Sequence, residues 1–163
     1  MKAITLTFVL AIILNHNSIA QKITVPSPFT KRNVKQNDTV AYAIIKYNKH
    51  RDRYIFKNVK AATLNKQEII EIEKLTSSAV SKYKRETNDN MRNRNLSSYY
   101  RQYVAVINSH GEKEVWVNCF CAVDDNGWTN HIVQVDDGGS CYFNLKINLT
   151  RKKYSMFGTN GLA

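Results

Sequence analysis

The clearest pattern in the chain is the strict alternation of apolar and polar side chains over residues 141–149. A period of two is typical of a β-strand that buries one face. Residues 114–123 alternate in the same way. The apolar row of the first segment is Cys141, Phe143, Leu145, Ile147 and Leu149, and its polar row is Tyr142, Asn144, Lys146 and Asn148. In the second segment Val115, Val117, Cys119 and Cys121 form one row, and Trp116, Asn118 and Phe120 form the opposite row.

A helical period begins after residue 65. Asn65 and Glu68 have the spacing of a capping box, in which each side chain accepts from the backbone N–H of the other residue. Lysine and arginine residues cluster in the last turn, where cations interact favourably with the helix dipole. We therefore expect one helix over residues 66–85. Its apolar stripe consists of Ile69, Ile72, Leu75, Ala79, Val80 and Tyr83.

The rest of the chain predicts shorter strands and turns. Two segments rich in β-branched and aromatic residues, 38–48 and 54–59, flank a polar turn and predict a hairpin. An Asn-Gly turn signal precedes another short strand. We expect a loop over residues 86–98. The remaining strands are predicted over residues 100–107, 128–135 and 154–157.

Together these elements predict an α+β domain, in which one long amphipathic helix packs on an antiparallel sheet. The helix stripe would cover the two rows that contain the cysteines. The order of hairpin, helix and strands is compatible with a cystatin-like or related roll fold. Fold does not fix function, and the Q-x-V-x-G signature of cystatin inhibitors is absent from the chain.

The first 20 residues have the order of a secretory signal peptide. A short positive start, Met1-Lys2, precedes the apolar stretch from Ala3 to Leu14, and small residues stand at Ser18 and Ala20. The apolar run is shorter than the roughly 20 residues that cross a bilayer. The alternative is a buried N-terminal strand or helix. We expect cleavage after Ala20, a secreted or periplasmic location and no transmembrane segment in the mature protein.

The expected mature chain divides into two parts. Residues 21–37 contain both prolines, Pro26 and Pro28, and we expect an extended segment there. Residues 38–163 have the length of a single α+β domain. We expect this domain to be monomeric.

The three cysteines refine the picture of the sheet. An exported protein meets oxidising conditions, so one disulfide and one remaining thiol are expected. Cys119 and Cys121 lie two residues apart on one face and rarely bridge each other, so Cys141 is expected to pair with one of them. A zinc site is disfavoured, because the three cysteines have no Cys or His partner at the spacing of zinc ligands. We expect neither a metal nor another cofactor.

The charge suggests a class of partner. The chain has 24 Lys and Arg residues against 13 Asp and Glu, a formal net charge of +11. Loss of Lys2 with the signal peptide would leave +10. Such a surplus attracts anionic envelope components, and it also favours solubility. Because the positive residues are spread along the chain, both interpretations stay open.

Candidate catalytic residues are few. The simplest candidate for a hydrolase or nuclease site would use Asp136, Asp137 and His131, since paired carboxylates and an imidazole support hydrolysis. The same Asp-Asp-Gly pattern, however, is what a tight turn requires. A cysteine nucleophile is disfavoured because all three cysteines lie on apolar rows. The chain has neither a G-x-S-x-G nor an H-E-x-x-H motif.

Aromatic residues offer a candidate binding surface. Trp116, Phe120 and Tyr142 would share the sheet face opposite the helix, and exposed aromatic rows often mark interaction sites. The alternative is that the N-terminal segment covers them. These residues support a non-enzymatic exported domain that binds an anionic or protein partner. The two other hypotheses are the hydrolase or nuclease and a secreted enzyme inhibitor.

The C-terminal third resembles a group of small exported proteins of Gram-negative bacteria that have no assigned activity. The residues that carry the resemblance are VWVNCFC (115–121), DGGSCYFNLKINL (137–149) and NGLA (160–163). The resemblance implies export and a β-rich C-terminal half. It supplies no catalytic residues.

Overall fold

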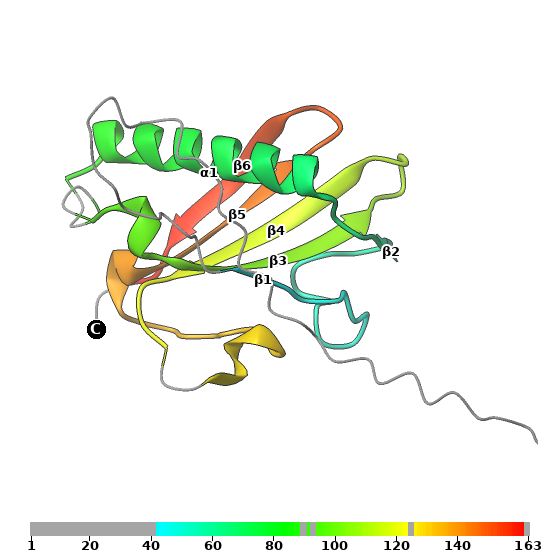
Figure 1. The fold of residues 1–163 in the computed structure, drawn as a ribbon, viewed down its shortest axis with the longest axis horizontal. Helices are drawn as coiled ribbons and strands as arrows, with labels where there is room; N and C mark the ends of the chain where they lie inside the picture. Colours follow the sequence, from blue (N-terminus) through cyan, green and yellow to red (C-terminus); the bar gives the residue numbers. More distant parts are fainter. Residues whose placement is uncertain (1–41, 89–90, 92–93, 124–125, 162–163) are drawn as a thin grey trace, which may run out of the picture.

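A computed structural model describes residues 42–88, 91, 94–123 and 126–161 (Figure 1). The predicted signal peptide and the predicted extended segment over residues 21–37 lie outside the described residues. In the described part of the chain, no helix is long and apolar enough to cross a membrane.

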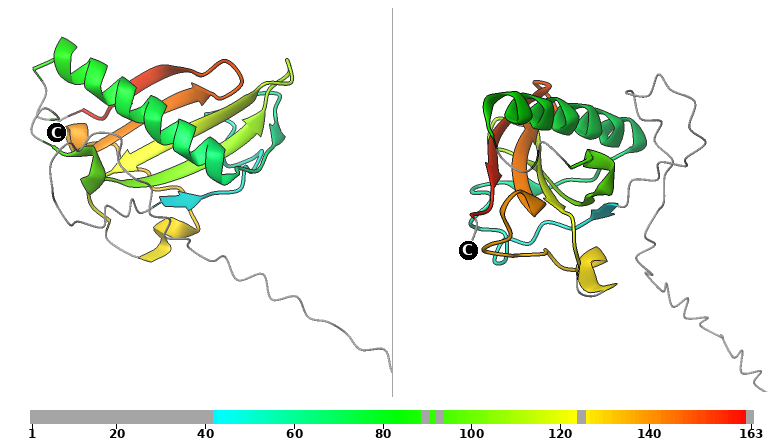
Figure 2. Two further views of the ribbon diagram at one scale, coloured as in Figure 1. Left: turned by 45° about the horizontal axis from the view of Figure 1, so that its top comes forward. Right: turned by 90° about the vertical axis from the view of Figure 1, so that its left-hand side faces the viewer.

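The structure is one helix on one mixed sheet, which confirms the α+β class. Helix α1 (Lys66–Glu86) lies along one face of a six-stranded sheet (Figures 1 and 2). The strand order is β1-β3-β4-β5-β6, and β2 pairs with β3 beside β1. All pairs are antiparallel except β1 with β3. The strands are β1 (Tyr42–Ile44), β2 (Lys60–Ala61), β3 (Tyr100–Ile107), β4 (Lys113–Phe120), β5 (Tyr142–Asn148) and β6 (Lys153–Thr159).

The start of α1 is fixed by the predicted capping box. Asn65 Oδ1 accepts from the Glu68 backbone N–H, and Glu68 Oε2 accepts from the Asn65 backbone N–H, each at 2.9 Å. Glu68 also pairs with Lys113 Nζ at 2.6 Å, which ties the first turn of the helix to β4. The helix ends one residue beyond the predicted range. The capping box and the apolar stripe are therefore both found at the predicted residues.

The main core lies between α1 and the sheet. The predicted rows from the two alternating strands do face the helix, and Val115, Val117 and Cys119 are fully buried there. Opposite them on β5, Phe143, Leu145 and Ile147 are also buried. The helix contributes the apolar stripe that its period predicted: Ile69, Ile72, Leu75, Ala79 and Val80.

The predicted hairpin over residues 38–48 and 54–59 is wrong. Residues 38–41 lie outside the described part of the chain; among the described residues of the two segments only Tyr42–Ile44 pairs as a strand, and its partner is β3 in parallel. Residues 48–56 instead fold around Asp52, whose carboxylate accepts from the Asn48 backbone N–H at 2.7 Å. The Asp52 carbonyl accepts from the backbone of Ile55 and Phe56. The buried Asp52 therefore stabilises a turn that extends through the apolar residues expected to form the second strand.

The predicted strand over residues 128–135 is also wrong. The segment begins with a 3₁₀ helix, η3 (Asn126–Thr129), and continues without strand pairing among the described residues. The other predicted strands are confirmed, and the last one is longer than expected, because β6 extends over Lys153–Thr159.

Candidate binding site

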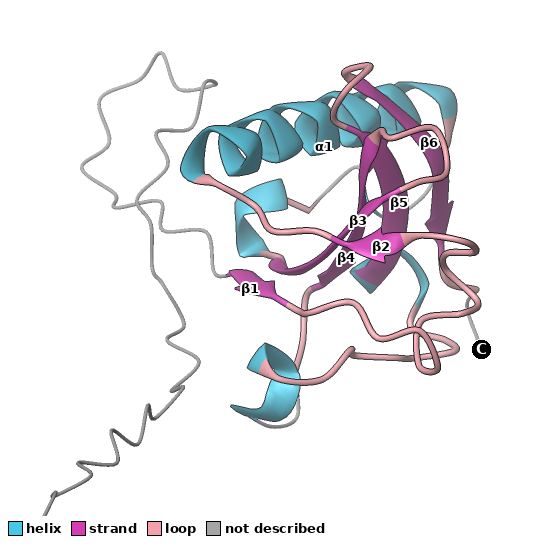
Figure 3. Cartoon of the chain, turned by 90° about the vertical axis from the view of Figure 1, so that its right-hand side faces the viewer, coloured by secondary structure: helices cyan, strands magenta, loops and turns pink. Residues whose placement is uncertain are grey.

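Two loops cover the sheet face opposite α1. Residues 45–59 and residues 126–137 fold back onto β3 and β4, on the side away from the helix (Figure 3). They enclose a second, smaller core. Its buried members are Ala43, Ile45, Ile55, Phe56, Val104, Val106, Trp116 and Ile132.

This second core corrects the expected aromatic surface. Trp116 is 7% exposed and Phe120 is 0% exposed, so neither forms part of an open aromatic row. Phe120 stacks on Tyr100 at 5.8 Å between ring centroids, and Trp128 meets it edge-on at 5.9 Å. The alternation of β4 is confirmed, but long connecting loops cover its second face. Among the described residues, the cover comes from these two loops. Tyr142 alone of the three predicted binding residues is half-exposed.

A buried pair of carboxamides holds the loop of residues 126–137. Gln102 and Asn118 lie opposite each other on β3 and β4, and Asn118 Nδ2 donates to Gln102 Oε1 at 3.1 Å. The Val133 backbone N–H donates to Gln102 Oε1, and the Val133 carbonyl accepts from Asn118 Nδ2, each at 2.9 Å. Gln102 Nε2 also donates to the carbonyls of Trp128 and His131. Side-chain amides therefore supply the partners that a neighbouring strand would otherwise provide.

Replacing Gln102 with methionine is expected to lower the free energy of unfolding by about 2 kcal/mol, because backbone groups of the loop would lose buried partners. Amide hydrogen exchange of residues 128–133 should become faster than in the native protein. Urea unfolding and hydrogen exchange measure the two effects. The same replacement at the exposed Gln67 of α1 is the control. Unchanged exchange in the loop would contradict this role for Gln102.

The loop of residues 45–59 is held from β5. The Lys146 ammonium donates to the Ile55 carbonyl, and it lies over the Phe56 ring at 4.8 Å from the centroid. Burial lowers the pKa of Lys146. The long lysine side chain thus fixes the first loop against the same sheet face that carries the second loop.

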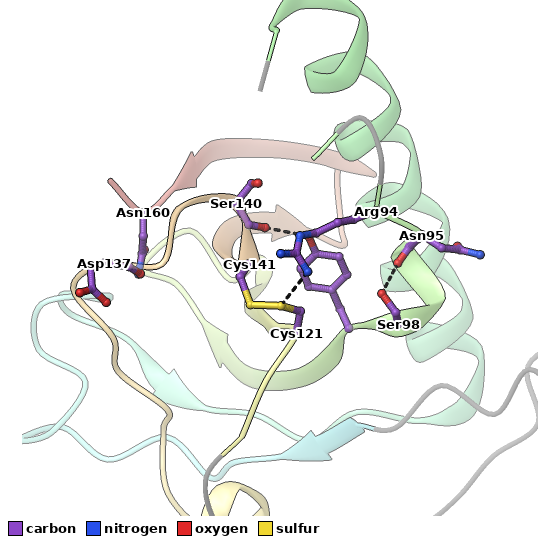
Figure 4. The surroundings of a disulfide bond; sticks show 9 residues. Arg94, Asn95, Ser98, Cys121, Asp137, Ser140, Cys141 and Asn160 are labelled. Carbon is purple, nitrogen blue, oxygen red and sulfur yellow. Dashed lines mark hydrogen bonds between the residues drawn. A yellow bond between two sulfur atoms is a disulfide. The ribbon is translucent and has the colours of Figure 1, made fainter. Parts of the chain in front are cut away.

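The end of the sheet near β6 is held by a disulfide and by Asn160. Cys121 and Cys141 form the disulfide, with 5.1 Å between their Cα atoms, which confirms the predicted involvement of Cys141. Figure 4 shows Arg94 beside this disulfide, and its Nη1 donates to Cys121 Sγ at 3.1 Å. On the other side, Asn160 Nδ2 donates to the carbonyls of Val135 and Asp137. These bonds fix the end of the second loop.

Between the two loops lies a cleft of about 310 Å³. Its floor is formed by Asn118 and Trp116 of β4 and by Tyr142 and Asn144 of β5. Its walls include Tyr54, Gln134 and Asp136. Tyr54 Oη accepts from Gln134 Nε2 at 2.7 Å, so the two walls contact each other directly. Among the described residues that line the cleft there is one carboxylate and no lysine or arginine.

The residues of the hydrolase hypothesis are divided between two hollows. Asp136 lines the cleft, whereas His131 lines a neighbouring hollow of about 290 Å³. Residues 133–135 line both hollows. Asp137 contributes its carbonyl to the bond with Asn160. Within the described residues no group of three or more His, Cys, Asp and Glu side chains could hold a metal ion.

The remaining cysteine is enclosed by the main core. Cys119 is unpaired and 0% exposed. Burial raises the pKa of Cys119 to about 12. A thiolate is the nucleophilic form of cysteine, so this position is unsuited to nucleophilic chemistry.

Native protein is therefore expected to resist iodoacetamide at pH 8, whereas protein unfolded in urea should be alkylated once, at Cys119. The physical reason is the combined lack of access and of thiolate. Mass spectrometry of tryptic peptides reports the labelled position, and the unfolded sample is the positive control. Rapid labelling of the native protein would show that the thiol is reachable.

A buried ion pair lies beneath α1. Arg101 Nε is 3.1 Å from Glu73 Oε1, and the Arg101 side chain is 1% exposed. Arg101 also donates to the carbonyls of Tyr99 and Leu96. The Tyr103 hydroxyl donates to Glu73, and burial followed by the Glu73 charge raises the pKa of Tyr103 well above its ordinary value. This group connects the helix to β3 and was not predicted from the sequence.

Comparisons of the chain with protein-family models, with curated proteins and with solved structures found no match.

Proposed function

We propose that the protein is an exported, non-enzymatic binding domain, and that its ligand occupies the cleft between the two loops. The observation that carries the proposal is the cleft itself, about 310 Å³ in volume, with aromatic and carboxamide side chains converging on it from five segments. Small-molecule sites are commonly concave and combine aromatic walls with a few placed polar groups.

The walls of this cleft are held before any ligand arrives. The Gln102–Asn118 pair fixes one loop, Lys146 fixes the other, and Asn160 fixes the end of the second loop. A preorganised site loses little conformational entropy when the ligand binds. This rigidity supports a binding role for the cleft.

Binding is favoured over catalysis by the placement of the reactive groups. Asp136 and His131 line separate hollows, and Cys119 is enclosed in the core. The arrangement offers no imidazole beside the carboxylate of the cleft among the described lining residues. No observation of the structure favours the inhibitor hypothesis, and the cystatin-like roll stays a prediction about the fold.

Export is part of the proposal. The disulfide between Cys121 and Cys141 fits an oxidising compartment, and the order of residues 1–20 fits a signal peptide. We propose secretion or periplasmic location after cleavage behind Ala20, and a monomer in solution. The anionic partner suggested by the net charge would contact the outer surface, because the cleft carries a carboxylate and no cation among its described lining residues.

The test is a thermal-shift screen of the purified protein against size-fractionated extracts of envelope and culture medium. At least one fraction is expected to raise the melting temperature of the native protein. The Asn144→Ala and Tyr54→Ala variants should lose this response, because both residues line the cleft. The control is Ile70→Ala, at an exposed position of α1.

The screen also separates binding from catalysis. Ligand recovered after long incubation should have an unchanged mass. A cleaved or modified ligand would show an enzyme. A response that is equal in the native protein and in both cleft variants, or no response at all, would refute the proposed site.

A further inference from the structure

We propose that the cleft selects a short neutral saccharide. This inference rests on the proposed function, since it names the class of ligand for the same cleft. Three properties of the lining carry it: the aromatic surfaces, the unpaired polar groups and the charge.

The aromatic surfaces come from three separate segments. Tyr54 belongs to the first loop and is 57% exposed, Tyr142 belongs to β5 and is half-exposed, and Trp116 of β4 contributes its remaining accessible edge. The face of an aromatic ring carries partial negative charge. A sugar ring presents C–H groups on its flat sides, and these groups pack favourably on such a face. Tyr54 is the most exposed of these three aromatic residues.

The polar groups of the lining differ in how far they are already used. Asn118 and Asn160 are engaged with loop carbonyls, so they shape the cleft. Asn144 and Asp136 also line it, and within the described part of the chain their side chains have no hydrogen-bond partner. A carboxamide both donates and accepts, whereas a carboxylate only accepts. A sugar hydroxyl also donates and accepts, so adjacent hydroxyls can satisfy the two groups together.

Charge and polarity argue against other ligand classes. An anionic sugar or a phosphate would meet the Asp136 carboxylate without a lysine or arginine among the described lining residues. A purely apolar ligand would cover Asn144 and Asp136 and leave their polar atoms unpaired, which is costly. A quaternary ammonium ion is the strongest competitor, because aromatic rings and a carboxylate attract cations. The long-range field of a protein with a formal net charge of +11, or +10 after loss of Lys2 with the signal peptide, opposes that ion.

Isothermal titration calorimetry of the purified protein with defined probes tests the inference. The neutral probes are cellotriose, maltotriose, mannotriose, xylotriose and N,N′,N″-triacetylchitotriose. Trigalacturonate is the anionic probe and choline chloride is the cationic probe. At least one neutral trisaccharide is expected to bind, while trigalacturonate and choline produce no heat of binding.

The variants locate the binding site. Tyr54→Ala is expected to weaken saccharide affinity by roughly 3- to 10-fold through loss of ring contact. Asn144→Ala is expected to weaken it by about 10-fold through loss of hydrogen bonds. Ile70→Ala should bind like the native protein. Far-ultraviolet circular dichroism shows whether each variant is folded, and Asn144→Ser serves as a milder replacement if Asn144→Ala is not.

The outcomes distinguish this inference from the proposed function. Choline or trigalacturonate binding that depends on Tyr54 and Asn144, without binding of a neutral saccharide, overturns the ligand class and leaves the binding cleft intact. The same conclusion follows if no probe binds while an extract fraction still gives the variant-sensitive thermal shift. Saccharide binding that is unaffected by both cleft variants overturns the inference, because the sugar would then bind elsewhere.

Discussion

The Glu73→Gln variant is expected to unfold with a free energy about 3–5 kcal/mol lower than that of the native protein. Arg101 is 1% exposed and its charge is paired with Glu73 beneath α1. Removing the carboxylate leaves a buried guanidinium without a counter-charge, and water cannot reach it to compensate. Urea unfolding followed by circular dichroism measures the loss.

Two comparisons make this prediction specific. Glu86→Gln, at an exposed position near the end of the same helix, should change stability by less than about 0.5 kcal/mol. The double variant Glu73→Leu/Arg101→Met should be more stable than the Glu73→Gln single variant, because it removes both charges. A single variant as stable as the native protein would show that Arg101 is solvated in solution.

The Cys121→Ser/Cys141→Ser double variant is expected to have a free energy of unfolding about 3 kcal/mol lower than that of the native protein. The disulfide links residues separated by 20 positions, and opening it enlarges the conformational freedom of the unfolded chain. Urea unfolding of the native protein with and without reductant should give the same difference. Cys119→Ala keeps the disulfide and should lose less stability than the double variant. An unchanged unfolding midpoint in the double variant would mean that this link does not constrain the unfolded chain.

The helix side of the molecule was predictable from sequence because its signals are local. The period of the stripe, the Asn65–Glu68 capping box and the alternation of β4 and β5 all depend on residues near one another in the chain. The cysteine spacing also narrowed the disulfide to two alternatives. Each of these features is determined by the geometry within one helix or strand, or by the geometry between two such elements.

The loop side was not predictable because its organisation depends on single long-range contacts. The run of charged residues 49–53 is typical of a solvated turn, yet Asp52 is 0% exposed and organises the surrounding backbone. Asn118 stands between Val117 and Cys119, whereas Gln102 follows Arg101, so the sequence contains only a weak signal of a buried polar role. Their pairing follows only from the β3–β4 register, which the sequence does not reveal.

Two of the three predicted binding residues belong to the candidate site, but they do not form the expected exposed aromatic row. Trp116 and Tyr142 do line the cleft as parts of its floor, whereas Phe120 is buried against Tyr100 and Trp128. Tyr54 and Asn144 were missed as site residues. Tyr54 was assigned to a strand, and Asn144 was counted only as a member of a polar row. Their convergence depends on how the two loops fold back over the sheet.

The sheet of this protein separates the residues that maintain its architecture from those that line the proposed binding cleft. Packing against α1 depends on one face, whereas the cleft is built on the other face from connecting segments. Connecting segments generally tolerate sequence variation better than the elements they join. Natural or engineered diversification of residues 133–136 is therefore expected to change ligand choice while α1 and its packing are retained, which makes the scaffold suited to the evolution of new recognition.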